Sequence, residues 1–331
     1  MDTKVSWQEL ANSAKVFGHE YVSNGVGSDA SCLLRGDMTV HELEPGLLLY
    51  RTHVMDHCDI RTSHVLNPSL KVLLLLDGCT QLRYGRDWSV LDASHGPRGL
   101  LVNLTQEDVF MRQWKTGQTE RKLVLSVEPR WMEHKGILQS LPCLQQHLAR
   151  SRWQPSRKSL ALAEQLHHEA AQKEPPHSLQ RLQWLAKAQT ILVEALEIVM
   201  HRPAPQNQTE AHSIRTRQTK GLSVQAYRNL VALREWLATS ASDGLSIQAI
   251  SKHAGMSVSY LQRYFGEVAY GQSVVQFLRS QRLHRACLAL EREGVSVARA
   301  AEIAGYASVT HFAKAFRQAY GCAPSQWRSG A

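Results

Sequence analysis

The stretch AAEIAGYASVTHFAKAFRQAYG, residues 300–321, decides the fold of the last third of this 331-residue chain. It begins as an alanine-rich helix, breaks at Gly305 and restarts at once as a second helix. Phe312 and Phe316 lie four residues apart and therefore share one face of that second helix. Glycine adopts a left-handed turn conformation without strain, and Ser308 stands where an N-cap belongs. The stretch predicts two helices joined by a sharp turn.

The same pattern occurs a second time, because LSIQAISKHAGMSVSYLQRYF at residues 245–265 repeats its small and apolar positions. Gly255 and Ser257 take the places of the turn glycine and the capping serine. In both copies, the face of the second helix opposite its apolar residues is polar. A major groove of DNA admits such a helix, whose polar side chains then reach base edges. The sequence therefore predicts two helix-turn-helix units, at about 245–266 and 295–317.

A single linker helix is predicted between the two units, in SVVQFLRSQRLHRACLALEREG at residues 273–294. At 1.5 Å per residue it would be roughly 30 Å long. Successive major-groove faces lie ~34 Å apart, so this helix would space the two units by about one turn of DNA. Arg279, Arg282 and Arg285 on this helix either contact phosphates or face solvent, and the sequence leaves both interpretations open.

The positive charge of the chain is confined to its C-terminal part. Residues 1–201 contain 22 Lys and Arg against 22 Asp and Glu, whereas residues 202–331 contain 16 against 7, which is the whole net charge of +9. A basic excess in one module favours a polyanionic partner, because Lys and Arg release phosphate counterions on binding. A solubilising surface is the alternative.

The N-terminal part has the pattern of β-strands. Short apolar or alternating runs follow one another between turn residues, among them GLLLYRTHVM, SLKVLLLLDGCTQLRYG and ERKLVLSVEP. Such runs are typical of strands. We expect a small antiparallel barrel or jelly roll at about 40–130, of a kind that can enclose a small ligand.

Helical periodicity follows at about 156–200. One stripe of this segment is apolar and consists of Leu182, Leu185, Ile191, Leu192, Leu196 and Val199. The stripe packs either on the barrel or against a second subunit. HRPAPQNQTEAHSIRTRQTKG is polar and lacks periodicity, so we expect a linker at 202–221. The plan is a sensing and dimerisation domain at 1–201 and a DNA-binding domain at 222–331.

Composition indicates a cytoplasmic protein. The chain is 43% hydrophobic and 20% charged, and its N-terminus lacks the apolar core of a signal peptide. The longest aliphatic run, at residues 72–76, is far shorter than the ~20 residues needed to cross a bilayer. The six cysteines show no paired spacing, which favours reduced thiols.

A metal site and an enzyme are both disfavoured. His53, His57 and Cys58 lie close together in sequence, but in an extended segment four residues span roughly 13 Å. Two ligand atoms that each lie ~2.1 Å from one metal ion are only ~4 Å apart. The chain also lacks a nucleophile elbow, a glycine-rich phosphate loop and a zinc-binding H-E-x-x-H helix. We expect no catalytic residue, metal or cofactor.

AGYASVTHFAKAFRQAYGCAPSQWR, with GMSVSYLQRYF upstream, resembles the DNA-binding domain of the AraC/XylS family of bacterial transcription regulators. The resemblance covers about 222–328. It implies base contacts from the first unit by Ser259, Gln262 and Arg263 and from the second by Thr310, His311 and Lys314. It also implies a DNA backbone contact by Arg317. Ser251 departs from the family pattern, where a small alanine is usual.

The resemblance also implies an overall plan: an α+β two-domain protein with an N-terminal cupin-like barrel, a helical segment and an all-α C-terminal domain. Such regulators are homodimers that bind two adjacent major-groove segments of double-stranded DNA and usually activate transcription by recruiting RNA polymerase. A small-molecule effector at the N-terminal domain would control this one. The alternative is an effector-independent regulator whose N-terminal domain serves dimerisation or a protein partner.

Overall fold

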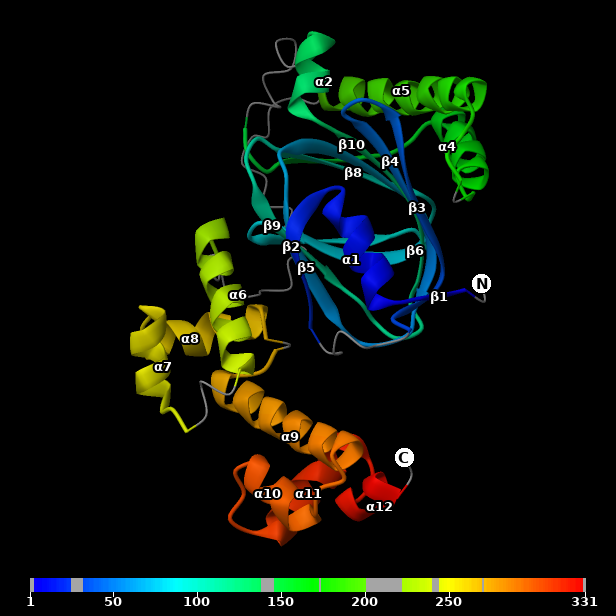
Figure 1. Cartoon of the computed structure of the whole chain (residues 1–331). Coiled ribbons are helices and arrows are strands. Elements are labelled where there is room, and N and C mark those ends of the chain that lie inside the picture. The colour runs from blue at the N-terminus through cyan, green and yellow to red at the C-terminus, as the bar shows by residue number, and fades with distance from the viewer. Residues whose placement is uncertain are drawn as a thin grey trace. The chain divides into compact units, whose positions relative to one another are not determined.

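The computed structural model describes residues 3–24, 32–137, 146–172, 174–200, 222–239, 244–269 and 271–329. The chain divides into two compact units, Met1–Arg228 and Asn229–Ala331, whose elements are labelled in Figure 1. This division falls inside helix α6 (Val224–Ala238), so the start of α6, which the sequence places in the DNA-binding domain, groups with the N-terminal unit. The predicted linker at 202–221 lies outside the described residues.

The N-terminal unit is built on antiparallel strands that begin earlier than residue 40, so the predicted barrel was too short. In the described residues the sheet has 11 strands. They are β1 (Lys4–Val5), β2 (Gly18–Asn24), β3 (Leu34–Glu44), β4 (Leu47–Asp56), β5 (Arg61–Leu66), β6 (Ser69–Tyr84), β7 (Asp87–Asp92), β8 (Arg98–Leu104), β9 (Asp108–Gln113), β10 (Thr119–Val127) and β11 (Ala149–Trp153).

The long strand β6 makes the sheet curl into a half-barrel. Its first half pairs with β10 and β8, and its second half pairs with β9 and β7. Gly78 lies between the two halves with φ +81°, and a Cβ there would be 2.0 Å from the carbonyl oxygen of Thr119. Only glycine therefore lets β10 approach β6 at this point.

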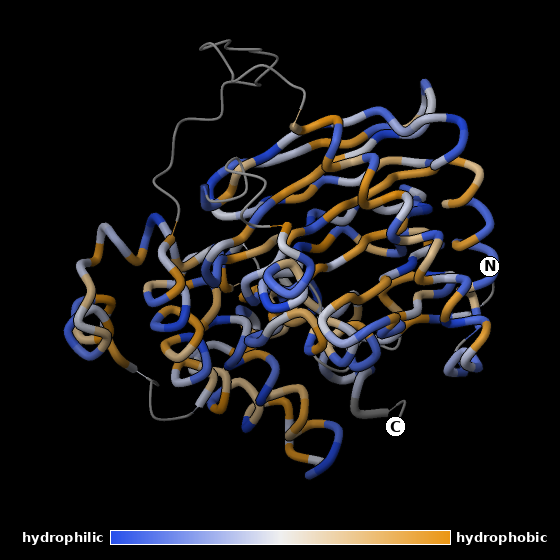
Figure 2. Tube along the Cα trace, turned by 90° about the horizontal axis from the view of Figure 1, so that it is seen from above, coloured by the Kyte–Doolittle hydropathy of each residue, from blue (hydrophilic) through white to orange (hydrophobic). Residues whose placement is uncertain are grey.

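Both faces of β6 are buried, which explains its unbroken leucine run. Val72 and Leu74 belong to a cluster on the outer face, whereas Leu73 and Leu75 point into the half-barrel. Successive side chains of a strand point to opposite faces. Figure 2 shows hydrophobic residues along the strands of this unit.

Four helices accompany the sheet in the described residues: α1 (Trp7–Lys15), α2 (Pro129–His134), α4 (Arg157–Glu169) and α5 (Ser178–Met200). α4 and α5 lie together against the outer face (Figure 1), where Trp184, Ala188 and Ile191 are buried. The predicted stripe thus packs on the barrel, with one correction: Leu182 is 61% exposed. None of the described helices is long and apolar enough to span a bilayer.

The C-terminal unit contains, after α6, the elements α7 (Ile247–Ala254), α8 (Val258–Tyr264), the 3₁₀ turn η3 (Phe265–Glu267), α9 (Val274–Arg292), α10 (Val297–Ile303), α11 (Val309–Tyr320) and α12 (Pro324–Ser329). The second half of α9 packs with α10 and α11 through Leu283, Cys287 and Phe316. The first half of α9 brings Phe277 to within 5.7 Å of the Phe265 ring. The predicted fold class is confirmed: an antiparallel half-barrel domain and an all-α domain with two helix-turn-helix units joined by a linker helix.

Candidate functional site

The first helix-turn-helix unit has the predicted turn and cap. Gly255 ends α7 in the left-handed conformation, with φ 62°. The Ser257 hydroxyl accepts a hydrogen bond of 3.1 Å from the backbone N–H of Tyr260, as an N-cap side chain does. Leu261 and Phe265 are fully buried and hold α8 in place.

Ser251, the departure from the family pattern, has a structural role that the sequence did not reveal. Its hydroxyl donates a hydrogen bond to the carbonyl oxygen of Met256. This bond crosses the Gly255 turn, so it ties the end of α7 to the residue before the cap of α8. A serine at this position therefore supports the turn between the two helices.

The second unit repeats the turn but not the cap. Gly305 has φ 72°, and a Cβ there would be 3.1 Å from Nη1 of Arg282. Ser308 occupies the N-cap position of α11 in an extended conformation, yet its side chain makes no capping hydrogen bond. Ser308 therefore lies at the predicted cap position, but its side chain does not cap the helix. Phe312 and Phe316 are fully buried, as their spacing predicts.

The polar faces of α8 and α11 are free to contact a partner. All six predicted base-contact residues are exposed: Ser259, Gln262, Arg263, Thr310, His311 and Lys314. Arg317, the predicted backbone contact, is exposed as well. Within the described residues, one interaction involves these seven side chains: the Arg263 guanidinium lies 5.3 Å from the centre of the Tyr264 ring. Their hydrogen-bonding groups therefore remain available to DNA.

One arginine of α9 has a structural role. The Nε of Arg279 donates a hydrogen bond of 2.8 Å to the Tyr306 hydroxyl, at the turn of the second unit. Trp236 of α6 stacks on His253 of the first unit, with 3.8 Å between ring centroids. These contacts join residues far apart in sequence, and no periodic sequence pattern predicts them.

A second candidate site is a cavity of ≈ 100 Å³ inside the half-barrel. One water needs about 10–15 Å³ of such space, so the cavity is large enough for a molecule bigger than a water. Its walls are mostly apolar and aromatic, and include Phe17, Tyr50, Tyr84, Phe110 and Trp114. Helix α1 contributes Leu10 and lies over the strands (Figure 1).

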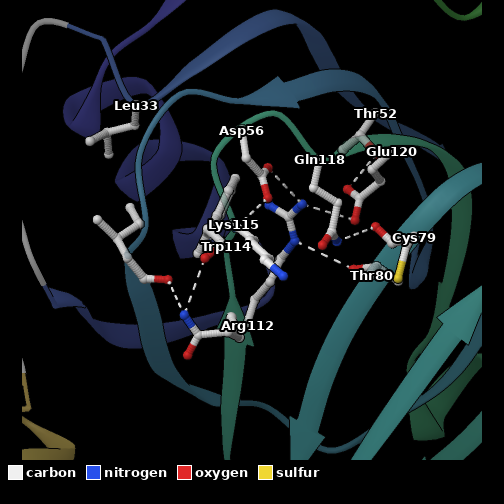
Figure 3. Close-up of polar contacts among 12 residues, drawn as sticks. Leu33, Thr52, Asp56, Cys79, Thr80, Arg112, Trp114, Lys115, Gln118 and Glu120 are labelled. Carbon is white, nitrogen blue, oxygen red and sulfur yellow. Dashed lines mark hydrogen bonds and ion pairs between the residues drawn. The ribbon is translucent and has the colours of Figure 1, made fainter.

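Buried charged side chains line this cavity, and Figure 3 shows the polar contacts around one of them, Arg112. Its Nη2 is 3.2 Å from Asp56 and 3.1 Å from Glu120. Lys122 lies 2.7 Å from Glu120 on the same strand. Burial opposes the charged form of Glu120, but Arg112 and Lys122 overcome it and lower its pKa to about 2. The two carboxylates and these two cations thus compensate one another.

Sequence reasoning missed this network, although a signal was present. Arg112 stands two positions after Phe110. Glu120, Lys122 and Val124 likewise stand two positions apart along one strand. Charged side chains therefore share the strand face of buried apolar ones. A charge on an inward face is uncommon unless it is paired or functional.

The candidate metal ligands do not converge. The ring of His53, on the outer face of β4, lies 6.0 Å from the ring of His167. Across the described part of the chain, no three His, Cys, Asp or Glu side chains are placed to hold a metal ion. Cys58 instead lies with its Sγ 3.8 Å from the carbonyl oxygen of Leu33.

Comparisons with known proteins agree with this architecture. The family described as "Regulatory protein PchR N-terminal domain" matches residues 35–212, and a "Helix-turn-helix domain" family matches residues 250–330. Regulatory protein SoxS of Salmonella typhimurium is 31% identical over 96 residues, which is 29% of this chain and 89% of SoxS. The probable transcription factor PqrA of Proteus vulgaris is 27% identical over 96 residues, 28% of this chain and 78% of PqrA. A DNA-binding transcriptional dual regulator of Escherichia coli K-12 has 25% identity and a TM-score of 0.28, with 31% of this chain and 97% of that chain covered.

Two basic helix-turn-helix units on a separate helical domain define a DNA-binding transcription regulator. The PchR-type match spans more than half of the chain, and the helix-turn-helix match covers residues 250–330. The chain therefore belongs to the AraC/XylS family, with an N-terminal domain of the PchR type.

Proposed function

We propose that this chain is a cytoplasmic transcription activator that works as a homodimer and recruits RNA polymerase, under the control of a small molecule bound inside the half-barrel. The observation that carries the control by an effector is the cavity in the half-barrel, lined by aromatic rings and buried charges. Most ligand sites are mainly apolar pockets with a few polar groups that fix orientation. The effector would shift the balance between arrangements of the dimer.

Each helix-turn-helix unit reads one of two adjacent major-groove segments under this proposal. Ser259, Gln262 and Arg263 contact bases from α8. Thr310, His311 and Lys314 do so from α11, and Arg317 holds the DNA backbone. Support comes from their exposure and from the absence of competing hydrogen bonds to other described residues.

Sequencing the DNA fragments that the purified full-length protein captures tests the proposal. We expect an enriched motif of two segments about one helical turn apart, and a change in capture when a small-molecule fraction of cell extract is added. Transcription in vitro from the captured DNA should then rise. Equal capture of all sequences would exclude sequence-specific reading.

A second candidate is an effector-independent regulator whose N-terminal domain binds a partner chain. Exposed apolar side chains on α5 favour it: Leu179 is 69% exposed, Leu182 61%, Val193 52% and Met200 52%. Thermal-shift measurements over a metabolite panel separate the two. Stabilisation by a small molecule supports the sensor, whereas stabilisation by a protein partner alone supports the second candidate.

A further inference from the structure

One arginine of the linker helix is half-buried and lacks a counter-ion. Arg282 lies near the middle of α9, and its Nε is buried with no hydrogen-bond partner among the described residues. No carboxylate of these residues lies within 4.0 Å of its guanidinium, whereas Arg299 of α10 has Glu302 at 2.7 Å. Buried polar atoms without a partner are rare in proteins and call for an explanation.

The turn of the second helix-turn-helix unit orients this arginine. A Cβ at Gly305 would lie 3.1 Å from Nη1 of Arg282 and 3.8 Å from its Cδ, so the side chain lies directly against the turn that leads into α11. Arg279 lies three residues earlier, on the same face of α9, and its Nε already donates a hydrogen bond to the Tyr306 hydroxyl. Of these two arginines at the turn, Arg282 is therefore the one whose guanidinium is free to bind an anion.

The position of Arg282 along α9 fits the stretch of DNA between the two proposed binding segments. Helix α9 runs from the first unit to the second (Figure 1), and its 19 residues make it roughly 29 Å long at 1.5 Å each. The turn against which Arg282 lies is followed by Thr310 and His311, the proposed base contacts at the start of α11. Because the sugar-phosphate backbone borders the groove that α11 would enter, a cation beside the start of this helix lies close to phosphates.

We propose that Arg282 binds a DNA phosphate between the two major-groove segments, beside the start of α11. The proposal rests on the proposed recognition of DNA by two units, and it adds a contact made by the linker helix itself. A guanidinium presents a planar fork of N–H donors that matches the geometry of phosphate oxygens. Since the Gly305 turn already orients this side chain, binding costs less conformational entropy than it does for a fully exposed arginine. Arg282 thus positions both units on the duplex without selecting a sequence.

The salt dependence of DNA binding by the full-length protein tests this assignment. The probes are a duplex with a motif captured by the protein and a duplex of the same composition with that motif scrambled. Arg282→Ala should make the slope of log K against log salt shallower by about 0.9, so between 50 and 200 mM salt it should lose about threefold less affinity than the wild type. Arg282→Lys keeps the charge and should keep the wild-type slope. Lys135→Ala is the control of equal charge change, because Lys135 pairs with Glu44 in the N-terminal unit, and it should leave the slope unchanged.

Duplexes in which a neutral methylphosphonate replaces one phosphate at a time locate the contact. The wild type should lose affinity at a position between the two segments, and Arg282→Ala should show no loss at that position while it keeps the losses elsewhere. Thermal unfolding checks that each variant folds. A wild-type slope and an unchanged methylphosphonate profile in Arg282→Ala would overturn the proposal and leave Arg282 as a support of the Gly305 turn. Equal binding of the captured and scrambled duplexes, with the shallower slope in Arg282→Ala, would instead overturn sequence-specific recognition and leave the phosphate contact in place.

Discussion

Lys71 makes the stability of the N-terminal unit depend on pH. Burial lowers its pKa from 10.5 to about 7, so the unfolded chain binds this proton more tightly than the folded one. The free-energy cost of the buried group is complete below pH 7 and disappears as pH rises toward 10.5. The groups around it change little in this range: His64 has a pKa of about 3 and Glu120 of about 2, burial raises the pKa of Tyr50, and Glu128 favours the charged lysine.

We therefore predict that Lys71→Met stabilises the N-terminal unit most at low pH. The gain should be largest near pH 6 and should fall by up to about 1.4 kcal/mol per pH unit between pH 7 and 10.5. Denaturant unfolding at pH 6 and pH 9.5 measures it. A gain that is the same at both values would show that Lys71 keeps an ordinary pKa.

Arg263 and Lys314 test the assignment of base contacts. Arg263→Ala or Lys314→Ala should relax base preference at one position each, with a loss of about 1–3 kcal/mol on cognate DNA. The measurement is affinity for a set of sites in which one base pair at a time is changed. Equal losses on cognate and scrambled DNA would instead assign the residue to the backbone.

Arg317 is expected to behave differently, because a phosphate contact carries no sequence information. Arg317→Ala should weaken binding to every DNA by a similar factor. The slope of log K against log salt should become shallower by about 0.9, the value for one lost phosphate contact. A loss restricted to one sequence would contradict the backbone assignment.

At the scale of elements, the two second helices of the helix-turn-helix units begin differently. Ser257 accepts a hydrogen bond at the start of α8, whereas Ser308 makes no such bond at the start of α11. Ser257→Ala should therefore destabilise the C-terminal unit by about 1 kcal/mol. Ser308→Ala is the matched control and should change it by a few tenths at most. Unfolding of both variants in urea provides the comparison.

The helix-turn-helix elements could be predicted because their signals are local. A turn glycine, a serine at the cap and aromatic residues four apart all lie within about twenty residues, as in residues 300–321. The interior of the half-barrel could not be predicted in this way. Arg112 meets Asp56 only after the four strands β4, β10, β6 and β9 have paired, and strand pairing depends on partners distant in sequence. The exposure of Leu182 was missed because helical spacing does not tell how wide a face the sheet covers.

At the scale of the whole molecule, the two units carry separate sources of stability. The charged residues Arg112, Asp56, Glu120 and Lys122 all lie in the N-terminal unit. Glu120 is buried in this unit. Removing one partner from a buried ion pair leaves an uncompensated charge, which costs about 3–5 kcal/mol. DNA recognition resides in the other unit, which has a core of its own.

Glu120→Gln should therefore lower the unfolding temperature of the N-terminal unit and leave that of the C-terminal unit unchanged. Glu164→Gln is the control, since the Arg121–Glu164 pair is partly exposed and contributes at most about 1 kcal/mol. Differential scanning calorimetry measures both transitions. A shift of the C-terminal transition in Glu120→Gln would show that the units do not unfold independently.

Strand β6 fixes the distances between the side chains along one wall of the half-barrel. Its first half carries Lys71 and Leu73 and its second half carries Leu82 and Tyr84, and the backbone joins them without a break. A molecule that enters the cavity cannot separate these side chains from one another. Any increase in cavity size must instead come from parts outside this strand, and α1 with the adjoining Phe17 is such a part, although the Phe17 carbonyl oxygen accepts a hydrogen bond from the backbone N–H of Asn67. A shift of this short helix would therefore change the size of the cavity.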